Sequence, residues 1–519
     1  MPAPRLVLLG SLALLPFVTA AQTPLESPKT EAGGAFGTAV AAIDDLNGDG
    51  VRDLIVGAPG ESVGGASAAG RVYVLSGATR AAIFTLESPT PEPNGGFGRS
   101  LTAAGDLNGD DVPDLIVGAP GESVEGVDNA GRAYAVSGAD GSVVQTLRSP
   151  TPTTDGGVGT RVVRLGDTNG DRVNDIGVAA AQDDPNAPPS GASPGAVFVF
   201  SGADGSLLDV ERGADPSDRF GSAIGGSDLN RDGRADLVVG IPAAASVGGT
   251  GSGIVALYAS GDPTRVVFEP PFPADDQEFG VSLAVIGDRD DDDVAEVLIG
   301  ARDSVFVFSG GTGETLLSLG SPWGADGRFG LAVSGAGNVE ETGAADLLVG
   351  APFEDVSGRD LAGRIYIFSG DDGALIRTLS SPNAEDNGRF GSAVALAGEV
   401  DDDNTADQIV GAPGETVNGQ AEAGRAYLLL SASVVSTEAE PSRDSLTVSP
   451  NPARGSLRLG VPEGTVGTLL VTDALGRVMH RGPVRNEIVL DVSRWAPGVY
   501  HVRLGTEAGI ATTAVSVVR

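Results

Sequence analysis

Cysteine is absent from this sequence of 519 residues, and histidine and lysine are almost absent. Without cysteine the chain cannot form disulfides, thiolate metal sites or a thiol nucleophile. Both histidines, His480 and His501, lie near the C-terminus, so the long stretch before them has no imidazole for catalysis or for binding a transition metal. Lys29 is the one lysine, which leaves a single candidate for Schiff-base chemistry.

Positive charge is also scarce. The sequence has 33 Lys and Arg against 70 Asp and Glu, a formal net charge of −37. Proteins that bind nucleic acids gain affinity from a basic face, which this composition cannot supply, so nucleic acid is excluded as a partner. Hydrophobic residues nevertheless make up 41% of the chain, enough to bury a core, which argues against global disorder.

The N-terminus predicts an export signal. Arg5 precedes an apolar run over residues 6–17, and small residues follow it, as in a signal peptide with its cleavage site. We therefore expect residues 1–21 to be a signal peptide. Because no other segment approaches about 18 consecutive apolar residues, no transmembrane segment is expected in the mature chain.

One pattern occurs seven times along the chain. The units open with Phe-Gly, or once with Val-Gly, at Phe36, Phe97, Val158, Phe220, Phe279, Phe329 and Phe390. An acidic loop follows in each unit and begins at Asp45, Asp106, Asp167, Asp228, Asp288, Asn338 and Glu399. Successive loops are separated by 61, 61, 61, 60, 50 and 61 residues. A regular period of this kind is typical of repeat architectures.

Each unit predicts four short strands. In the second unit these cover residues 97–104, 114–118, 132–137 and 142–147, and an Asp-Gly pair in the last link suits a tight hairpin. Helix-period patterning is absent, which argues against helical repeats. Four-stranded units repeated around an axis give a propeller, so the predicted fold class is all-β, with a seven-bladed β-propeller over residues 22–431.

The seventh unit lacks a fourth strand of its own. Leu-x-Ser-Pro segments introduce other units, at 86–89, 147–150 and 379–382. A further copy at 25–28 stands unpaired near the N-terminus. We therefore expect the N-terminal strand to complete the seventh blade and close the ring.

The acidic loops have the spacing of metal ligands. Oxygen-bearing side chains occupy positions 1, 3, 5 and 9, and the main-chain carbonyl of position 7 adds another oxygen. Hard, partly anionic oxygen ligands at a turn suit Ca²⁺, and we expect about five ions, or six if the seventh unit binds. The candidate ligands are Asp45, Asn47, Asp49, Val51, Asp53; Asp106, Asn108, Asp110, Val112, Asp114; Asp167, Asn169, Asp171, Val173, Asp175; Asp228, Asn230, Asp232, Arg234, Asp236; Asp288, Asp290, Asp292, Val294, Glu296; and Glu399, Asp401, Asp403, Thr405, Asp407.

The acidic loops allow two other interpretations, an EF-hand and a set of solvated turns. An EF-hand is unsupported, because position 12 of the first loop is Val56, inside a predicted strand, and no helix flanks the loop. The second is that Asp, Asn and Gly merely form good turns and that the acidity suits a saline habitat. Against it, several acidic groups within nine residues repel one another in at least five units. The sixth loop, with Asn338, Glu340, Thr342 and Asp346, lacks the position 5 carboxylate, and no ion is expected there.

These motifs carry a resemblance to a known family. The repeated unit resembles the FG-GAP repeats of the integrin alpha-subunit propeller, because Phe-Gly is followed by Asp-x-Asn-x-Asp-x-x-x-Asp and then by Gly-Ala-Pro. Gly-Ala-Pro stands at 57–59, 118–120, 350–352 and 411–413. The resemblance covers roughly residues 25–431 and implies seven blades, calcium on the loops of one face, and an ancestry associated with adhesion. The third, fourth and fifth units depart from Gly-Ala-Pro, and nothing resembles the integrin leg domains, so integrin-type signalling is not implied.

Composition changes after a predicted linker over residues 432–445. Residues 446–519 contain eight Arg against five Asp and Glu, and their alternating apolar runs predict a small β-sandwich. The segments 448–453, 473–477 and 497–502 resemble the type A sorting domain of the bacterial type IX secretion system. This resemblance implies the type IX machinery as a partner, a Bacteroidota-like source, and a secreted or cell-surface location in a Gram-negative bacterium. A generic immunoglobulin-like appendage is the alternative.

Three functions remain open: a calcium-binding surface module for an extracellular glycan, matrix polymer or protein; a structural component of an envelope or matrix; and a polysaccharide-active enzyme. The candidate acid–base groups recur with the repeat, whereas a catalytic site should occur once, so no enzyme is expected. The recurring groups are Tyr73, Tyr134, Tyr366 and Tyr427, expected to pack between blades, and Glu61, Glu122, Glu354 and Glu415, expected at turns or the rim.

The fifth unit departs most from the pattern, because its period is short and a loop after Arg302 is missing. Trp323 and Arg328 follow nearby in the sequence. We hypothesise a ligand-binding notch between the fifth and sixth blades. The alternative is a simple deletion beside a packed tryptophan.

Overall fold

The computed structural model describes two parts of the chain. The described residues are 22–180, 194–215, 217–246, 249–260, 265–324, 327–339, 343–401, 403 and 405–431 in the first part, and 447–449, 453–460, 466–473, 478–485, 487–495, 498–506 and 509–517 in the second. The expected signal peptide and linker lie outside these residues. The described secondary structure consists of strands, with no helix, which confirms the all-β class. No helix in the described part of the chain is long and apolar enough to cross a membrane.

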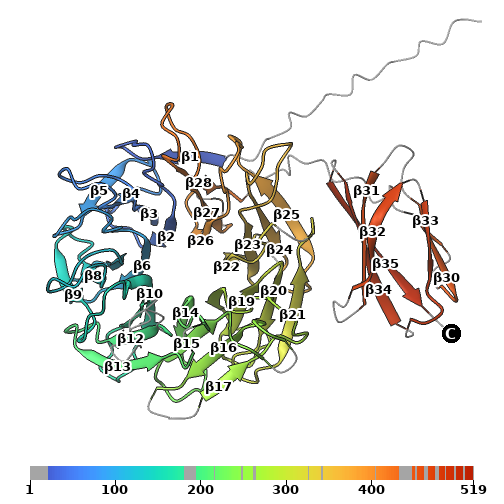
Figure 1. The fold of residues 1–519 in the computed structure, drawn as a ribbon, viewed down its shortest axis with the longest axis horizontal. Coiled ribbons are helices and arrows are strands. Elements are labelled where there is room, and N and C mark those ends of the chain that lie inside the picture. The colour runs from blue at the N-terminus through green and yellow to red at the C-terminus, as the bar shows by residue number, and fades with distance from the viewer. Residues whose placement is uncertain are drawn as a thin grey trace, which may run out of the picture.

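Seven four-stranded antiparallel sheets are arranged around a central axis, as Figure 1 shows. Blades 1 to 4 consist of β2 (Ala39–Ile43), β3 (Asp53–Ala58), β4 (Arg71–Leu75), β5 (Ala82–Glu87); β6 (Ser100–Gly105), β7 (Asp114–Ala119), β8 (Arg132–Val136), β9 (Val143–Leu147); β10 (Val158–Gly166), β11 (Asp175–Ala180), β12 (Ala196–Phe200), β13 (Leu207–Arg212); and β14 (Ala223–Ser227), β15 (Asp236–Ile241), β16 (Ile254–Tyr258), β17 (Arg265–Phe268). The predicted seven-bladed β-propeller is therefore confirmed.

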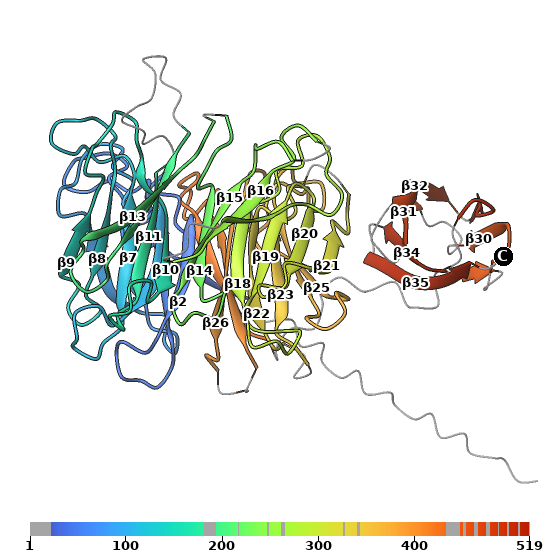
Figure 2. The ribbon, with the colours of Figure 1, turned by 90° about the horizontal axis from the view of Figure 1, so that it is seen from below.

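The remaining blades follow the same plan. They consist of β18 (Ser282–Ile286), β19 (Glu296–Ala301), β20 (Ser304–Phe308), β21 (Thr315–Gly320); β22 (Ala332–Gly337), β23 (Asp346–Ala351), β24 (Arg364–Phe368), β25 (Leu375–Ser380); and β26 (Ala393–Gly398), β27 (Asp407–Ala412), β28 (Arg425–Leu429) with β1 (Gln22–Glu26). The first strand of each blade lies nearest the axis, and Figure 2 shows the strands running through the thickness of the ring.

The N-terminal strand β1 closes the ring, as the sequence predicts. It pairs with β28 in antiparallel register from Gln22 opposite Leu429 to Glu26 opposite Arg425. Leu25 is 4% exposed and packs in a core cluster with residues of blades 1 and 7. The last blade thus combines the two ends of the repeat region, and β1 pairs with the outer edge of β28.

The repeated motifs form the contacts between blades. The second strand of every blade is buried along its whole length, and the core clusters combine side chains from adjacent blades. Gly57 of a Gly-Ala-Pro segment meets the Phe-Gly segment of the next blade so closely that an added Cβ would lie 2.1 Å from the carbonyl oxygen of Gly98. Phe97 then packs on Tyr134 with ring centroids 5.9 Å apart. The repeated tyrosines Tyr73, Tyr134, Tyr366 and Tyr427 each lie in a core cluster that combines adjacent blades, which confirms the expectation that they pack between blades.

The second part of the chain forms two further sheets. One contains β29 (Thr447–Ser449), β30 (Ser456–Gly460) and β33 (Glu487–Asp491); the other contains β31 (Val466–Asp473), β32 (Val478–Arg485), β34 (Gly498–Thr506) and β35 (Gly509–Val517). Leu457, Leu469, Val471 and Val502 are fully buried in one shared cluster. Two sheets around one apolar cluster agree with the predicted small β-sandwich.

Candidate functional site

The acidic loops all join the first strand of a blade to its second strand. Position 9 is the first residue of the second strand, as in Asp53 of β3, Asp114 of β7 and Asp407 of β27. Because this strand is the most buried in the blade, the position 9 carboxylate is held inside the protein, with an exposed fraction of 0% at all three residues. The fold therefore anchors one candidate ligand of each loop in the core and leaves the rest of the loop near solvent.

The position 9 carboxylates share one set of partners. Asp53 accepts main-chain hydrogen bonds from Leu46 at 2.8 Å and from Gly77 at 3.1 Å, and Asp114 accepts equivalent bonds. Burial raises the pKa of Asp53 above its ordinary value, and the neighbouring Asp49 and Asp45 add to the rise. Burial also raises the pKa of Glu296 and of Asp407 to about 7. A cation beside these groups would relieve the cost of charging them.

Position 1 accepts the main-chain N–H groups of its own loop. The Asp45 carboxylate accepts from Gly48 and Gly50, each at 2.7 Å. Burial acts to raise the pKa of the equivalent Asp106, but four such N–H donors outweigh it and lower that pKa. The loop is therefore folded around an ionised carboxylate.

Positions 5 and 7 repeat the same contact in six loops. The main-chain N–H of position 7 donates to the position 5 carboxylate at distances between 2.7 and 3.0 Å. The position 7 residues are Val51, Val112, Val173, Arg234, Val294 and Thr405. Because position 7 contributes only its main-chain N–H to this contact, its side chain is free to vary, which explains how Arg234 is tolerated at a position that would give a cation its carbonyl oxygen.

Three of the six loops gather three acidic groups closely. Their ligand oxygens lie within 4.8 Å of one another in the groups Asp45, Asp49, Asp53; Asp288, Asp290, Glu296; and Glu399, Asp401, Asp407. The buried Oε2 atoms of Glu296 and Glu399 have no hydrogen-bond partner among the described residues. A set of carboxylate oxygens with unpartnered buried atoms fits a hard divalent cation. The seventh loop thus gathers positions 1, 3 and 9, as the fifth loop does, whereas the first loop gathers positions 1, 5 and 9.

The second, third and fourth loops place asparagine at position 3. Asn108 donates from its side chain to Asp110 at 3.0 Å, and its carbonyl oxygen accepts the N–H of Asp110 at 2.9 Å. Asn169 and Asn230 make equivalent bonds. The structure therefore brings positions 3 and 5 together in these loops. In the sixth loop, Glu340 and Thr342 lie outside the described residues, while Asp346 is buried and accepts main-chain bonds as its equivalents do.

The repeated glutamates form buried polar clusters, so their expected place at turns or the rim is corrected. Glu122 has an exposed fraction of 0%, and it accepts hydrogen bonds from Ser88 and from the hydroxyl of Tyr134. Glu61 accepts from Ser27 and, at 2.6 Å, from Tyr73. The serine belongs to the Leu-x-Ser-Pro segment of the preceding blade, so each cluster joins two blades. Sequence spacing alone could not show this contact, because its residues are 34 positions apart.

We expect Glu122→Ala to lower the free energy of unfolding by about 3 kcal/mol, because it leaves the hydroxyls of Ser88 and Tyr134 buried without their acceptor. Urea denaturation followed by fluorescence measures the change. Glu125→Ala is the matched control, since Glu125 is exposed and forms a surface ion pair with Arg148 at 2.8 Å. That control should cost less than about 1 kcal/mol. Equal losses in the two variants would contradict the role of the cluster.

The hypothesised notch between blades 5 and 6 receives less support. The loop between β19 and β20 is reduced to Arg302 and Asp303, as expected. The guanidinium of Arg364, however, lies 4.3 Å from the ring centroid of Trp323, and Arg328 forms an ion pair with Glu278. These partners favour the alternative of a packed tryptophan beside a deletion.

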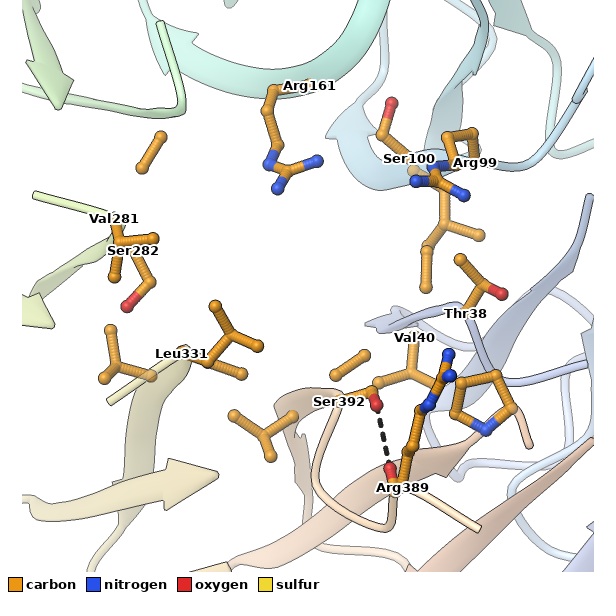
Figure 3. A pocket seen from close by; sticks show the side chains of 18 of the residues that line it. Thr38, Val40, Arg99, Ser100, Arg161, Val281, Ser282, Leu331, Arg389 and Ser392 are labelled. Carbon is orange, nitrogen blue, oxygen red and sulfur yellow. Dashed lines mark hydrogen bonds between the residues drawn. The ribbon is translucent and has the colours of Figure 1, made fainter. Parts of the chain in front are cut away.

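Sequence reasoning missed a cavity at the mouth of the central channel. Its volume is about 510 Å³, and it is lined by the first residues of the inner strands. Figure 3 shows Arg99, Arg161 and Arg389 projecting toward this cavity from three different blades. The mouth lies at the opposite ends of the inner strands from the acidic loops. Its arginines belong to units 2, 3 and 7, so no repeat pattern drew attention to them.

Comparison with known proteins agrees with these features. The FG-GAP repeat model matches residues 36–75, 97–136 and 220–258, and the model of the secretion system C-terminal sorting domain matches residues 447–518. Among curated proteins, integrin alpha-2 of Mus musculus is 36% identical over 108 residues, and integrin alpha-IIb of Mus musculus is 42% identical over 98. These matches cover 20% and 18% of this chain and 9% of each integrin subunit.

A third relative is the phosphatidylinositol-glycan-specific phospholipase D of Homo sapiens, which is 33% identical over 225 residues. That match covers 38% of this chain and 25% of the phospholipase. The chain thus spans a quarter or less of the length of these relatives. Fold, motifs and comparisons agree that the chain contains FG-GAP repeats, and that it is similar in its propeller to integrin alpha subunits and in its C-terminal part to the sorting domain of a secretion system.

Proposed function

We propose that this chain is a secreted, calcium-binding propeller that serves as an adhesion or ligand-binding module at the surface of a Gram-negative bacterium. The propeller, taken as residues 22–431, would bind an extracellular glycan, matrix polymer or protein. The domain taken as 446–519 would pass the chain to the type IX secretion machinery. The observation that carries the proposal is the recurrence of one loop geometry, with the same carboxylate contacts, in six blades.

The charge of the loops supports calcium as the resident ion. Each of the six loops places three to six acidic side chains within nine residues, and in three loops three of them approach within 4.8 Å. Like charges at that separation are costly even with partial screening, and a divalent cation offsets the repulsion. We propose one ion in each of units 1 to 5, and a sixth if unit 7 binds, held by the residues predicted from the sequence.

The C-terminal domain supports export. A sorting domain of a secretion system implies passage out of the cell, and the predicted signal peptide would supply the first step across the inner membrane. A propeller delivered in this way meets extracellular ligands rather than cytoplasmic ones. A function limited to envelope or matrix structure is the second candidate, because the same calcium-loaded ring could serve as a spacer.

The repeated polar groups argue against an enzyme. Glu61, Glu122 and Glu415 are each buried in a cluster with a tyrosine and a serine, so they are occupied in joining blades. The relationship to a phospholipase D covers only a quarter of that protein. We propose that the chain binds its ligand without converting it.

A binding screen tests this proposal. We expect the mature chain, from Gln22 onward, to bind at least one glycan or matrix component on an array in about 2 mM free calcium. The binding signal should fall at least about tenfold in chelator, because the loops lose their ions. The Asp110→Asn variant should need more calcium, whereas Asp140→Asn, in an exposed hairpin turn, should not. Absence of binding at any calcium concentration would favour the structural candidate.

A further inference from the structure

The mouth of the central channel is a cationic site in an acidic protein. The side chains that line its cavity include three arginines, Arg99, Arg161 and Arg389, and a single carboxylate, that of Glu422. The cavity therefore has a net charge of +2, while the chain as a whole has −37. If charged residues were distributed at random in a chain with about twice as many acidic as basic residues, the cavity would have a net negative charge. The local charge points to a ligand of negative charge.

These arginines are not used for structure. Among the described residues, none of the three forms an ion pair with a carboxylate, although Arg71, Arg328 and several other arginines of the ring do. Within the described part of the chain, the Arg161 guanidinium donates a hydrogen bond to the main-chain oxygen of its neighbour Thr160, at 2.9 Å. Arg389 has a ring contact with Phe353, 5.9 Å from the ring centroid. Their remaining N–H groups face the cavity and are open to solvent.

The geometry of blade 3 brings Arg161 into the channel. The register of β10 against β11 shifts between Val158 and Arg161, so the inner strand bulges at the mouth. Arg99, from the neighbouring blade, lines the same cavity and carries the same charge. Like charges around one cavity repel each other, and a bound anion offsets that repulsion.

The hydroxyl groups that line the cavity already donate hydrogen bonds to main-chain carbonyls. Ser100 donates to the carbonyl of Gly159 at 2.8 Å, and Ser282 donates to that of Gly330 at 2.7 Å. Thr38 and Ser392 likewise donate to main-chain carbonyls. The donors left for a ligand are therefore guanidinium N–H groups, whose planar fork suits the oxygens of sulfate, phosphate and carboxylate.

We propose that the mouth of the central channel binds an anionic ester group, a sulfate or a phosphate monoester carried by a larger molecule. The single negative charge of a sulfate ester and the two charges of a phosphate monoester are both complementary to the net +2 of the cavity, and a volume of about 510 Å³ holds one such group with part of its carrier. The seven inner strands surround the group, so only a terminal or protruding ester reaches the arginines. This inference rests on the proposed function in that it names the ligand class of the propeller, but it does not depend on calcium, because the acidic loops lie at the other ends of the strands.

Isothermal titration of the mature chain with sodium sulfate and, separately, sodium phosphate tests the proposal. The titrations are made in saturating calcium chloride for sulfate and in chelator for both anions, so that calcium phosphate cannot form. We expect saturable binding of one anion, weakened at least about tenfold by Arg161→Gln and by Arg99→Gln, since each removes a charge-assisted bond. Arg148→Gln removes the same charge outside the cavity and should leave the affinity unchanged.

A variant that is expected to tighten anion binding complements the arginine variants. Glu422→Gln removes the one carboxylate of the cavity and should tighten anion binding by about threefold or more. Monosaccharide sulfates and phosphates then distinguish the two kinds of ester. Equal affinity in all variants would overturn the site, as would binding of acetate and glucuronate in place of sulfate and phosphate. If the anion fails to bind while calcium uptake is normal, the ligand class is wrong and the calcium proposal stands.

Discussion

The mature chain, stripped of metal, is expected to take up about five calcium ions and to gain a large increase in melting temperature. Binding to the native state alone stabilises it by about 2.7 kcal/mol for each site at a free concentration one hundred times Kd. Five sites on one closed ring would together add on the order of 10 kcal/mol. Calorimetric titration gives the number of ions, and a thermal scan at increasing calcium concentrations gives the stabilisation.

Single-loop variants assign the ions. Asp110→Asn removes one charge at position 5 of the second loop but keeps an oxygen that can accept the N–H of Val112. It should therefore fold and bind one ion fewer. Asp140→Asn is the matched control, because Asp140 is an exposed aspartate that accepts the N–H of Ser142 in a turn outside the loops. No uptake by the unmodified chain would mean that the loops are solvated turns.

The pH dependence of the metal-free chain gives an independent check. Burial raises the pKa of Glu296 and Asp407 to about 7 in the folded state, above their values of about 4.5 and 3.8 in an unfolded chain. The folded state then binds more protons than the unfolded state between these limits, so stability in chelator should rise as the pH falls from 8 to about 5. Saturating calcium should reverse the slope, because protons then compete with the ion for the same oxygens.

Removal of the closing strand is expected to destabilise the propeller strongly. Deletion of residues 22–30 removes β1, exposes the edge of β28, and uncovers the apolar surface on which Leu25 packs. It also takes Ser27 from the buried carboxylate of Glu61 and Glu26 from Arg425. Burial of one leucine contributes about 2 kcal/mol and a lost buried hydrogen bond costs 1–3 kcal/mol, so the total loss is about 5 kcal/mol or more.

A loss of that size should lower the melting temperature by about 10 °C in a ring of this length. Differential scanning calorimetry measures the shift. Lys29→Ala is the control within the same segment, because the Lys29 side chain is exposed and the hydrogen bond of this residue to Ser27 uses only its main chain. A synthetic peptide of residues 22–30 added to the deletion variant should restore part of the melting temperature. An unchanged melt after deletion would show that β1 does not hold the ring together.

The two faces of the ring have different proposed roles, calcium binding at one and ligand binding at the other. The loops that would hold calcium follow the inner strands, and the arginine-lined mouth precedes them. Calcium at one end would make the strands rigid, while the other end stays available for a ligand. Calcium would then affect ligand binding through the stability of the ring rather than through direct contact.

Much of this organisation follows from the sequence alone. The seven-fold period, the four strands in each blade, the closure by residues 25–28 and the acidic loops all depend on residues close together in one repeat, whose spacing is visible in one chain. The same local pattern determined the short loop after Arg302. The prediction of these features is reliable because the pattern recurs in several units, so a departure in one unit does not obscure it.

Other features were decided only by the tertiary structure. Closing the ring brings Ser88 to Glu122 and turns an apparent surface glutamate into a buried partner of Tyr134. It also gathers Arg99, Arg161 and Arg389 from three blades around one cavity, although their spacing in the sequence follows no period. Trp323 acquired a packing partner, Arg364, in the same way. The physical reason is common to all of them: a propeller places equivalent ends of every blade around one axis, so contacts between units depend on closure and not on distance along the chain.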